Sequence, residues 1–184
     1  MDQKPYWNSF LRLRYCIEDS MSWVVTFGMF TYGLSKPIQF KRTDLIDKTI
    51  SKLSGFELMW AFYGYSDAYV FILGIFEVFG GLLLFFRRTR IIGCLISTSI
   101  FINIIIQDII FGVPLGALRT ALIYQIFIVI ILILNAEKVI SSFSVLIKRK
   151  QEHVPKQIIA LNTVFTFFIF LVLKIFEYFF SRGF

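Results

Sequence analysis

One acidic side chain stands out because it lies in the middle of a long apolar run. Residues 68–86 form a run of 19 residues in which Glu77 is the one charged side chain. As a helix this run spans about 28 Å, the thickness of the hydrocarbon core of a bilayer. A charge at that depth costs about 2.5–3.5 kcal/mol or more, so such residues mark proton relays, ligand sites or buried pairs. We therefore take Glu77 as the candidate catalytic residue, a carboxylate that transfers a proton or anchors a ligand.

Polar side chains on three other apolar runs lie at a similar depth. At about 1.5 Å per residue from the nearest basic end, Glu77 is about 15 Å deep, and Thr26, Asn103 and Gln125 are about 18–20 Å deep. Polar groups at such depth face the protein interior and contact one another. Asn103 and Gln125 are therefore candidate ligand-binding residues. The alternative is structural, with Glu77 hydrogen-bonded to one of these three side chains and holding helices together.

Two more polar residues join the candidate ligand-binding set. Asn103 and Gln107 are four residues apart, so they share one face of a helix. Lys36 ends the first apolar run near the outer boundary, where an ammonium group can bind an anionic head group or a ligand carbonyl. Asp108 is a candidate partner for Lys36 or Arg119.

Glycines flank the buried carboxylate on its own helix face. Gly74, Glu77 and Gly81 are spaced i, i+3 and i+7. Small residues let neighbouring helix backbones approach closely, so this face is predicted to lie in a tight helix junction. Gly93 and Ser97 form a second small pair, which we assign to packing.

Aromatic side chains gather in the segment before the central run, namely Trp60, Phe62, Tyr63, Tyr65 and Tyr69. Amphipathic rings of this kind favour the level of the lipid head groups. They form either an interfacial belt or a platform over a ligand entrance. In the second interpretation Trp60 and Tyr69 contact the ligand.

The composition shows which elements position these residues. Hydrophobic residues make up 57% of the chain, 23 of its 184 residues are Phe, and the mean hydropathy is +0.74, which excludes an ordinary soluble domain. Helices satisfy their own backbone hydrogen bonds in lipid. We therefore predict an all-α polytopic membrane protein, a four-helix transmembrane bundle plus an additional C-terminal transmembrane helix. The five apolar runs are 17–35, 68–86, 91–111, 115–134 and 158–180.

Basic residues predict the orientation. Arg87, Arg88 and Arg90 form the tightest loop and should be cytoplasmic, which also places the N-terminus inside and the C-terminus on the opposite side. Eleven Lys and Arg residues then lie inside and seven outside. The expected division is a cytoplasmic N-terminal segment, a four-helix core, a basic cytoplasmic linker and a fifth helix with its tail, at 1–16, 17–137, 138–157 and 158–184.

Several function classes are excluded by the sequence. The net charge of +7 comes from residues between apolar runs, so it indicates topology and lipid contact rather than nucleic-acid binding. Cys16 and Cys94 form no C-x-x-C motif and are not a redox pair. The single histidine, His153, excludes a histidine-based metal site. No flavin, haem or metal motif is present, so no covalently bound cofactor is expected.

A set of short motifs extends over about residues 20–137. Its members are Gly33, Lys36, Trp60, Ser66, Gly74, Glu77, Arg88, Thr89, Arg90 and Asn103. Together they resemble the DoxX/DoxD-like family of small bacterial and archaeal membrane proteins. The resemblance implies a four-helix bundle in the bacterial inner membrane, often linked to redox chemistry, and one branch is the membrane subunit of a thiosulfate:quinone oxidoreductase. The chain departs from the pattern at Gln107 and Asp108, where relatives often carry an Asn, and in its fifth apolar run.

These observations lead to three functional hypotheses. The first is a redox-associated inner-membrane subunit that binds a quinone-like or lipidic molecule, with Glu77 handling a proton or anchoring the ligand. Its electrons then come from a partner or from the ligand itself. The second is a non-catalytic scaffold subunit that binds a protein partner through the fifth helix. The third is a small proton-coupled transporter.

Overall fold

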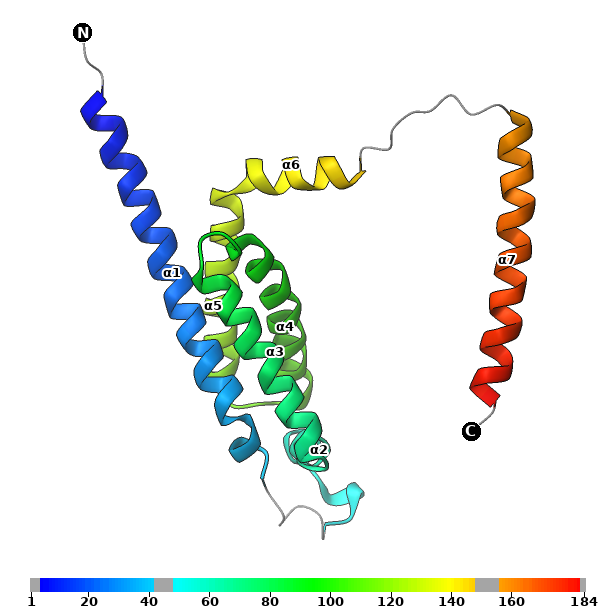
Figure 1. The fold of residues 1–184 in the computed structure, drawn as a ribbon. Helices are drawn as coiled ribbons and strands as arrows, with labels where there is room; N and C mark the ends of the chain where they lie inside the picture. Colours follow the sequence, from blue (N-terminus) through cyan, green and yellow to red (C-terminus); the bar gives the residue numbers. More distant parts are fainter. Residues whose placement is uncertain (1–3, 42–47, 148–155, 183–184) are drawn as a thin grey trace. The chain divides into compact units, whose positions relative to one another are not determined.

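The computed structural model describes residues 4–41, 48–147 and 156–182 (Figure 1). All elements in these residues are helices, as the sequence predicts. They are α1 (Lys4–Gln39), the short 3-10 helix η2 (Ile50–Lys52), α2 (Gly55–Gly64), α3 (Asp67–Phe85), α4 (Arg90–Phe111), α5 (Leu115–Leu134), α6 (Ala136–Ile147) and α7 (Lys156–Arg182).

Within the described residues, four helices are long and apolar enough to cross a membrane, which indicates a multi-pass membrane protein. They are α3, α4, α5 and the segment Ile158–Phe179 of α7. The helix ends lie within two residues of the predicted runs. The first predicted run, 17–35, is part of the longer helix α1, which is not among the four. Glu18, Asp19 and several Ser, Thr and Gly residues lower its hydropathy.

Four helices of the first unit, residues 1–142, pack in a ring. Helix α1 packs on α3, α3 on α4, α4 on α5, and α5 returns to α1, while α2 packs against α3 and α4. One apolar cluster fills the ring and a second lies beside α2. The ring cluster contains Val25, Met29, Leu84, Cys94, Phe101, Ala121, Ile128 and Ile131, and the second contains Phe40, Met59, Tyr63, Val70 and Val113.

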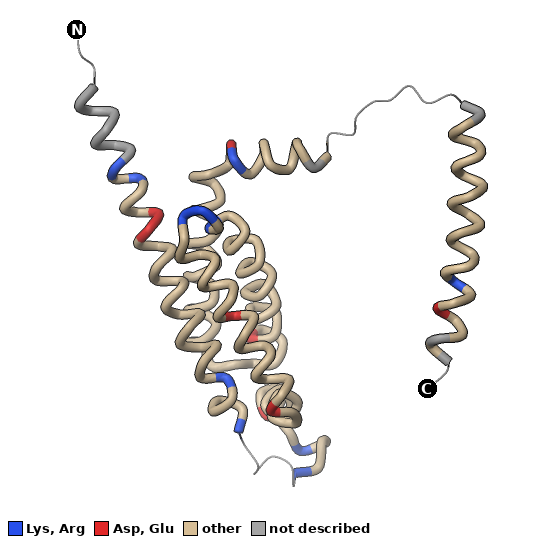
Figure 2. The backbone as a smooth tube through the Cα atoms, in the orientation of Figure 1, with Lys and Arg blue, Asp and Glu red and all other residues tan. Residues whose placement is uncertain are grey.

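Large apolar side chains also cover the outside of these helices. Phe27, Phe76 and Ile110 are among many that are more than half exposed. Figure 2 shows Lys and Arg toward the two ends of the first unit, with the middle of the helices largely free of them. An apolar middle with charged ends fits contact with a lipid bilayer.

Glycines allow a close approach between α1 and α3. A Cβ atom on Gly74 would lie 2.4 Å from the carbonyl oxygen of Gly33, and one on Gly33 would lie 2.8 Å from that of Gly74. A Cβ on Gly81 would lie 3.1 Å from the Cβ of Met29. The face of α3 that carries Glu77 therefore lies directly against α1.

A buried arginine ties the middle of α1 to the turn between α3 and α4. Arg90 is 2% exposed, and its guanidinium lies 3.1 Å from the Glu18 carboxylate and 2.8 Å from that of Asp19. Arg87 donates to the same Asp19, with 3.0 Å between Nε and Oδ1. Arg88 is exposed. Two of the three arginines assigned to topology thus also bind carboxylates on α1, contacts that the sequence analysis did not foresee.

The C-terminal part is a separate unit, residues 143–184. The first described part of the predicted linker, 138–147, is helical and belongs to α6, while residues 148–155 lie outside the described residues. In α7, each described residue of the apolar segment is exposed.

Candidate functional site

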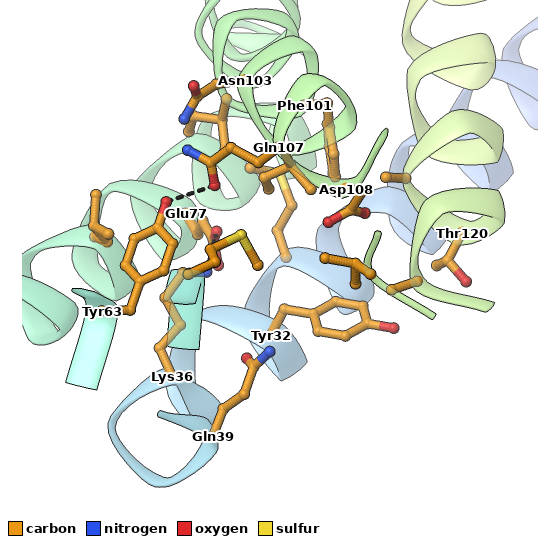
Figure 3. Close-up of a pocket in the computed structure, with 18 of the residues that line it drawn as sticks. Tyr32, Lys36, Gln39, Tyr63, Glu77, Phe101, Asn103, Gln107, Asp108 and Thr120 are labelled. Atoms are coloured by element: carbon orange, nitrogen blue, oxygen red, sulfur yellow. Dashed lines mark hydrogen bonds and ion pairs between the residues drawn. The ribbon is translucent and has the colours of Figure 1, made fainter. Parts of the chain in front are cut away.

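A cavity of about 470 Å³ lies in the first unit between the ends of α1, α3, α4 and α5 and the helix α2. Much of its wall is apolar or aromatic, including Met29, Phe40, Leu73, Phe76, Ile100 and Phe101. Figure 3 shows the polar side chains that share this wall. They include Tyr32, Lys36, Gln39, Tyr63, Glu77, Asn103, Gln107, Asp108 and Thr120.

An ion pair between α1 and α3 is the main charged feature of the cavity. Lys36 Nζ lies 2.8 Å from Glu77 Oε1, and these side chains are 12% and 6% exposed. Lys36 follows Gly33 by three residues, and Glu77 follows Gly74 by three. Helices α1 and α3 run antiparallel, since Ser22 contacts Leu84 while Gly33 contacts Gly74. Lys36 and Glu77 therefore lie one turn to opposite sides of the glycine crossing, and their side chains, which tilt toward the N-terminus of their own helices, meet beside it. The other carboxylate oxygen, Glu77 Oε2, is buried and has no hydrogen-bond partner among the described residues.

Helix α2 closes one side of the cavity with aromatic side chains. It begins in a capping box, in which Ser54 and Glu57 bind each other's backbone N–H groups. Tyr63 then donates its hydroxyl to Gln107 Oε1 at 2.6 Å, and Trp60 Nε1 donates to the Gln39 carbonyl at 3.2 Å. A tyrosine hydroxyl is protonated at neutral pH, and burial raises the pKa of Tyr63 further.

A second carboxyl group, Asp108, lines the cavity from the last turn of α4. It is 7% exposed, and its Oδ2 has no hydrogen-bond partner among the described residues. Helix α4 ends at Gly112, whose φ of 66° is in the left-handed region that glycine adopts without strain. This turn directs Val113 back into the cavity wall, where its N–H donates to the Asp108 carbonyl at 3.0 Å.

The structure brings together most of the predicted site residues. Lys36, Trp60, Asn103 and Gln107 line the cavity together with Glu77. Tyr69 is not among the described lining residues and stacks on Tyr63 with ring centroids 6.0 Å apart.

The predicted polar layer of four side chains does not form. Thr26 donates to the Gly81 carbonyl at 3.0 Å, and Gln125 lies 3.5 Å from the Thr98 hydroxyl, away from the cavity. Glu77 binds Lys36 rather than any of the three proposed partners. Counting residues gives the depth of a side chain, but helix rotation decides the direction in which it points.

Two buried site residues were absent from the predicted set. Tyr63 was only one member of an aromatic run, and Asp108 was only a possible partner for Lys36 or Arg119. A signal for Asp108 was its place beside Gln107, one turn before Gly112 ends the helix. For Tyr63 the sequence offered no signal that separates it from its aromatic neighbours.

Comparison with known proteins gives one similarity. The chain is 32% identical over 109 residues to the uncharacterized protein YwoB of Bacillus subtilis (strain 168), and the match covers 58% of this chain and 70% of that protein. No protein-family model matches the chain. No solved structure matches it.

Proposed function

The chain belongs to the protein family of Bacillus subtilis YwoB, and from its cavity we propose that it binds a small amphipathic molecule, quinone-like or lipidic, between its helices. The observation that carries the proposal is the Lys36–Glu77 pair in a largely apolar cavity of about 470 Å³. Ligand sites of this size combine apolar walls with a few polar groups that fix orientation. An apolar body with one polar head suits such a wall.

The setting proposed for this activity is the bacterial cytoplasmic (inner) membrane. The four long apolar helices and the resemblance to DoxX-like proteins support it. With α1 as a further spanning helix and the 87–90 turn in the cytoplasm, the cavity opens in the outer half of the bilayer. The N-terminus is then cytoplasmic and the C-terminus lies on the opposite side.

The residues of the cavity fit a quinone-like head group. The Lys36 ammonium and the amides of Asn103 and Gln107 are donors for carbonyl oxygens, and the rings of Phe40 and Trp60 suit contact with an aromatic ring. A bound quinone supplies the redox chemistry. The residues of the chain would orient the head group, and Glu77 would accept a proton from it at Oε2, the oxygen that Lys36 leaves unpaired. Electrons come from a partner protein or from the ligand.

The proposal is tested by binding of a short-chain quinone to the protein in lipid nanodiscs. We expect saturable binding, weakened about tenfold in Glu77→Gln, because the substitution removes the negative charge that holds Lys36 in place. Glu137→Gln, on the exposed face of α6, is the matched control. Binding that is unchanged in Glu77→Gln removes this carboxylate from the site, and no binding beyond that of empty nanodiscs refutes the proposal.

A second candidate function is a scaffold subunit of a larger complex. The observation that favours it is α7, an apolar helix of the second unit whose described spanning residues are all exposed. A protein partner that co-purifies with the full chain and is lost on deletion of residues 156–184 would support this function. A chain that is recovered alone and still binds its ligand would count against it.

A further inference from the structure

We propose that the ligand's head group donates hydrogen bonds to Asp108 and Glu77, so that the cavity selects a head bearing hydroxyl or ammonium groups over one that only accepts. This inference rests on the proposed function and names the chemistry of its ligand. It also adds Asp108 to the binding residues. Where the donating groups are hydroxyls, a quinol binds more tightly than its quinone.

The first step concerns unpaired acceptors. Glu77 Oε2 and Asp108 Oδ2 are buried oxygens of cavity-lining residues, and neither has a hydrogen-bond partner among the residues that the structure describes. Glu77 is 5% exposed and Asp108 is 7% exposed. Buried polar groups in folded proteins are nearly always hydrogen-bonded, because an unpaired one loses its water without replacement. A ligand that donates to these oxygens removes that penalty.

The second step concerns three donor side chains of the wall that already have an acceptor. Lys36 binds Glu77 Oε1, the Tyr63 hydroxyl binds Gln107 Oε1, and Trp60 binds the Gln39 carbonyl. The amide groups of Asn103 and Gln107 belong to less buried residues than Asp108. The most buried part of the wall therefore presents acceptors.

The third step concerns charge. The charged residues among the described cavity lining are one cation, Lys36, and two carboxyl groups, Glu77 and Asp108. Lys36 is 2.8 Å from Glu77, so its charge is already matched. A second carboxylate in an apolar setting needs a donor or a cation of its own. A hydroxyl head supplies the donor, and an ammonium head supplies both and can also face the aromatic rings of the wall.

The experiment compares three heads on the same ten-carbon chain, namely decylbenzoquinone, decylhydroquinone kept reduced without oxygen, and decylammonium. Binding to the wild-type protein in nanodiscs is measured against empty nanodiscs. We expect at least one of the two donor heads to bind about tenfold more tightly than the quinone. A tighter hydroquinone identifies a hydroxyl ligand, and a tighter ammonium identifies an amine.

A variant gives a second, independent readout. Asp108→Asn keeps the size of the side chain but adds an N–H donor, so we expect it to weaken the preferred donor head about tenfold and to leave the quinone equal or tighter. Asp67→Asn, an exposed carboxyl in the first turn of α3, is the matched control and should change neither.

The two proposals fail in different ways. Equal affinity for the three heads, or a preference for the quinone, overturns the donor inference and leaves the proposed function standing. No saturable binding of any head overturns both. A donor preference that persists unchanged in Asp108→Asn removes Asp108 from the site and overturns the inference.

Discussion

The crossing of Gly33 and Gly74 allows a sharp test, because a single methyl group at Gly74 should force two helices apart. In Gly74→Ala the new Cβ would lie 2.4 Å from the Gly33 carbonyl oxygen, whereas ordinary contacts begin at 3.4 Å. The helices must therefore separate by about 1 Å, since both groups that meet belong to regular helix backbone.

The size of the effect follows from two opposing terms. Overpacking of this kind costs about 1–3 kcal/mol, and the better helix propensity of Ala recovers up to about 1 kcal/mol. We expect a net loss of about 1–2 kcal/mol. A separation of 1 Å also stretches the Lys36–Glu77 contact from 2.8 Å beyond the range of a charge-assisted hydrogen bond, so ligand binding should weaken as well.

The assay is unfolding of purified protein in mixed micelles, titrated with a denaturing detergent and followed by circular dichroism. Gly116→Ala in α5 is the matched control, because its Cβ would meet nothing within 4 Å. It should be neutral or slightly stabilising. If Gly74→Ala and Gly116→Ala are equally stable, the close crossing does not set the geometry of the site and the reasoning is wrong.

Three further predictions use the same unfolding measurement or amide exchange. Lys36→Met leaves Glu77 unpaired and should cost about 3–5 kcal/mol, whereas adding Glu77→Leu should restore most of it, and additive losses would contradict a direct pair. Arg90→Met should also destabilise the protein by about 3–5 kcal/mol, because it leaves two carboxylates without the buried guanidinium that binds them. The ligand affinity of the folded protein should not change, because these carboxylates lie outside the cavity lining. The Lys48 ammonium and the helix N-cap lower the pKa of Glu57 from 4.5 to about 2, so protection of α2 amides should be full above pH 4.5 and be lost as the pH falls toward 2. Glu57→Gln should abolish that pH dependence, and an unchanged profile would show that Glu57 is not its cause.

Most of the long apolar helices could be predicted from the sequence because their signals are local. The length and apolarity of a run decide whether it can form a spanning helix, and the predicted ends lie within two residues of the helices α3, α4, α5 and α7. Helix α2 was harder to foresee, since its start depends on the capping box of Ser54 and Glu57 within a mixed aromatic segment.

The partners of the charged residues could not be predicted in the same way. Glu77 was identified because a charged side chain in an apolar run is energetically costly. Its partner Lys36 comes from another helix and was placed at the outer boundary of the membrane. Arg90 was assigned to topology, while its carboxylate partner Glu18 lies on α1. Such pairs depend on helix rotation and crossing, which no local pattern records.

The sequence by itself therefore determined that the chain is helical, that several helices suit a membrane, and that Glu77 is the one charged side chain in its apolar run. The tertiary structure decided which carboxylate oxygens of the cavity have a partner and which are unpaired. The glycine contact of α1 with α3 joins Lys36 to one oxygen of Glu77, and the end of α4 brings Asp108 to the same cavity. The physical reason is that burial and hydrogen bonding depend on how helices meet, whereas helix formation in an apolar run depends on the run alone.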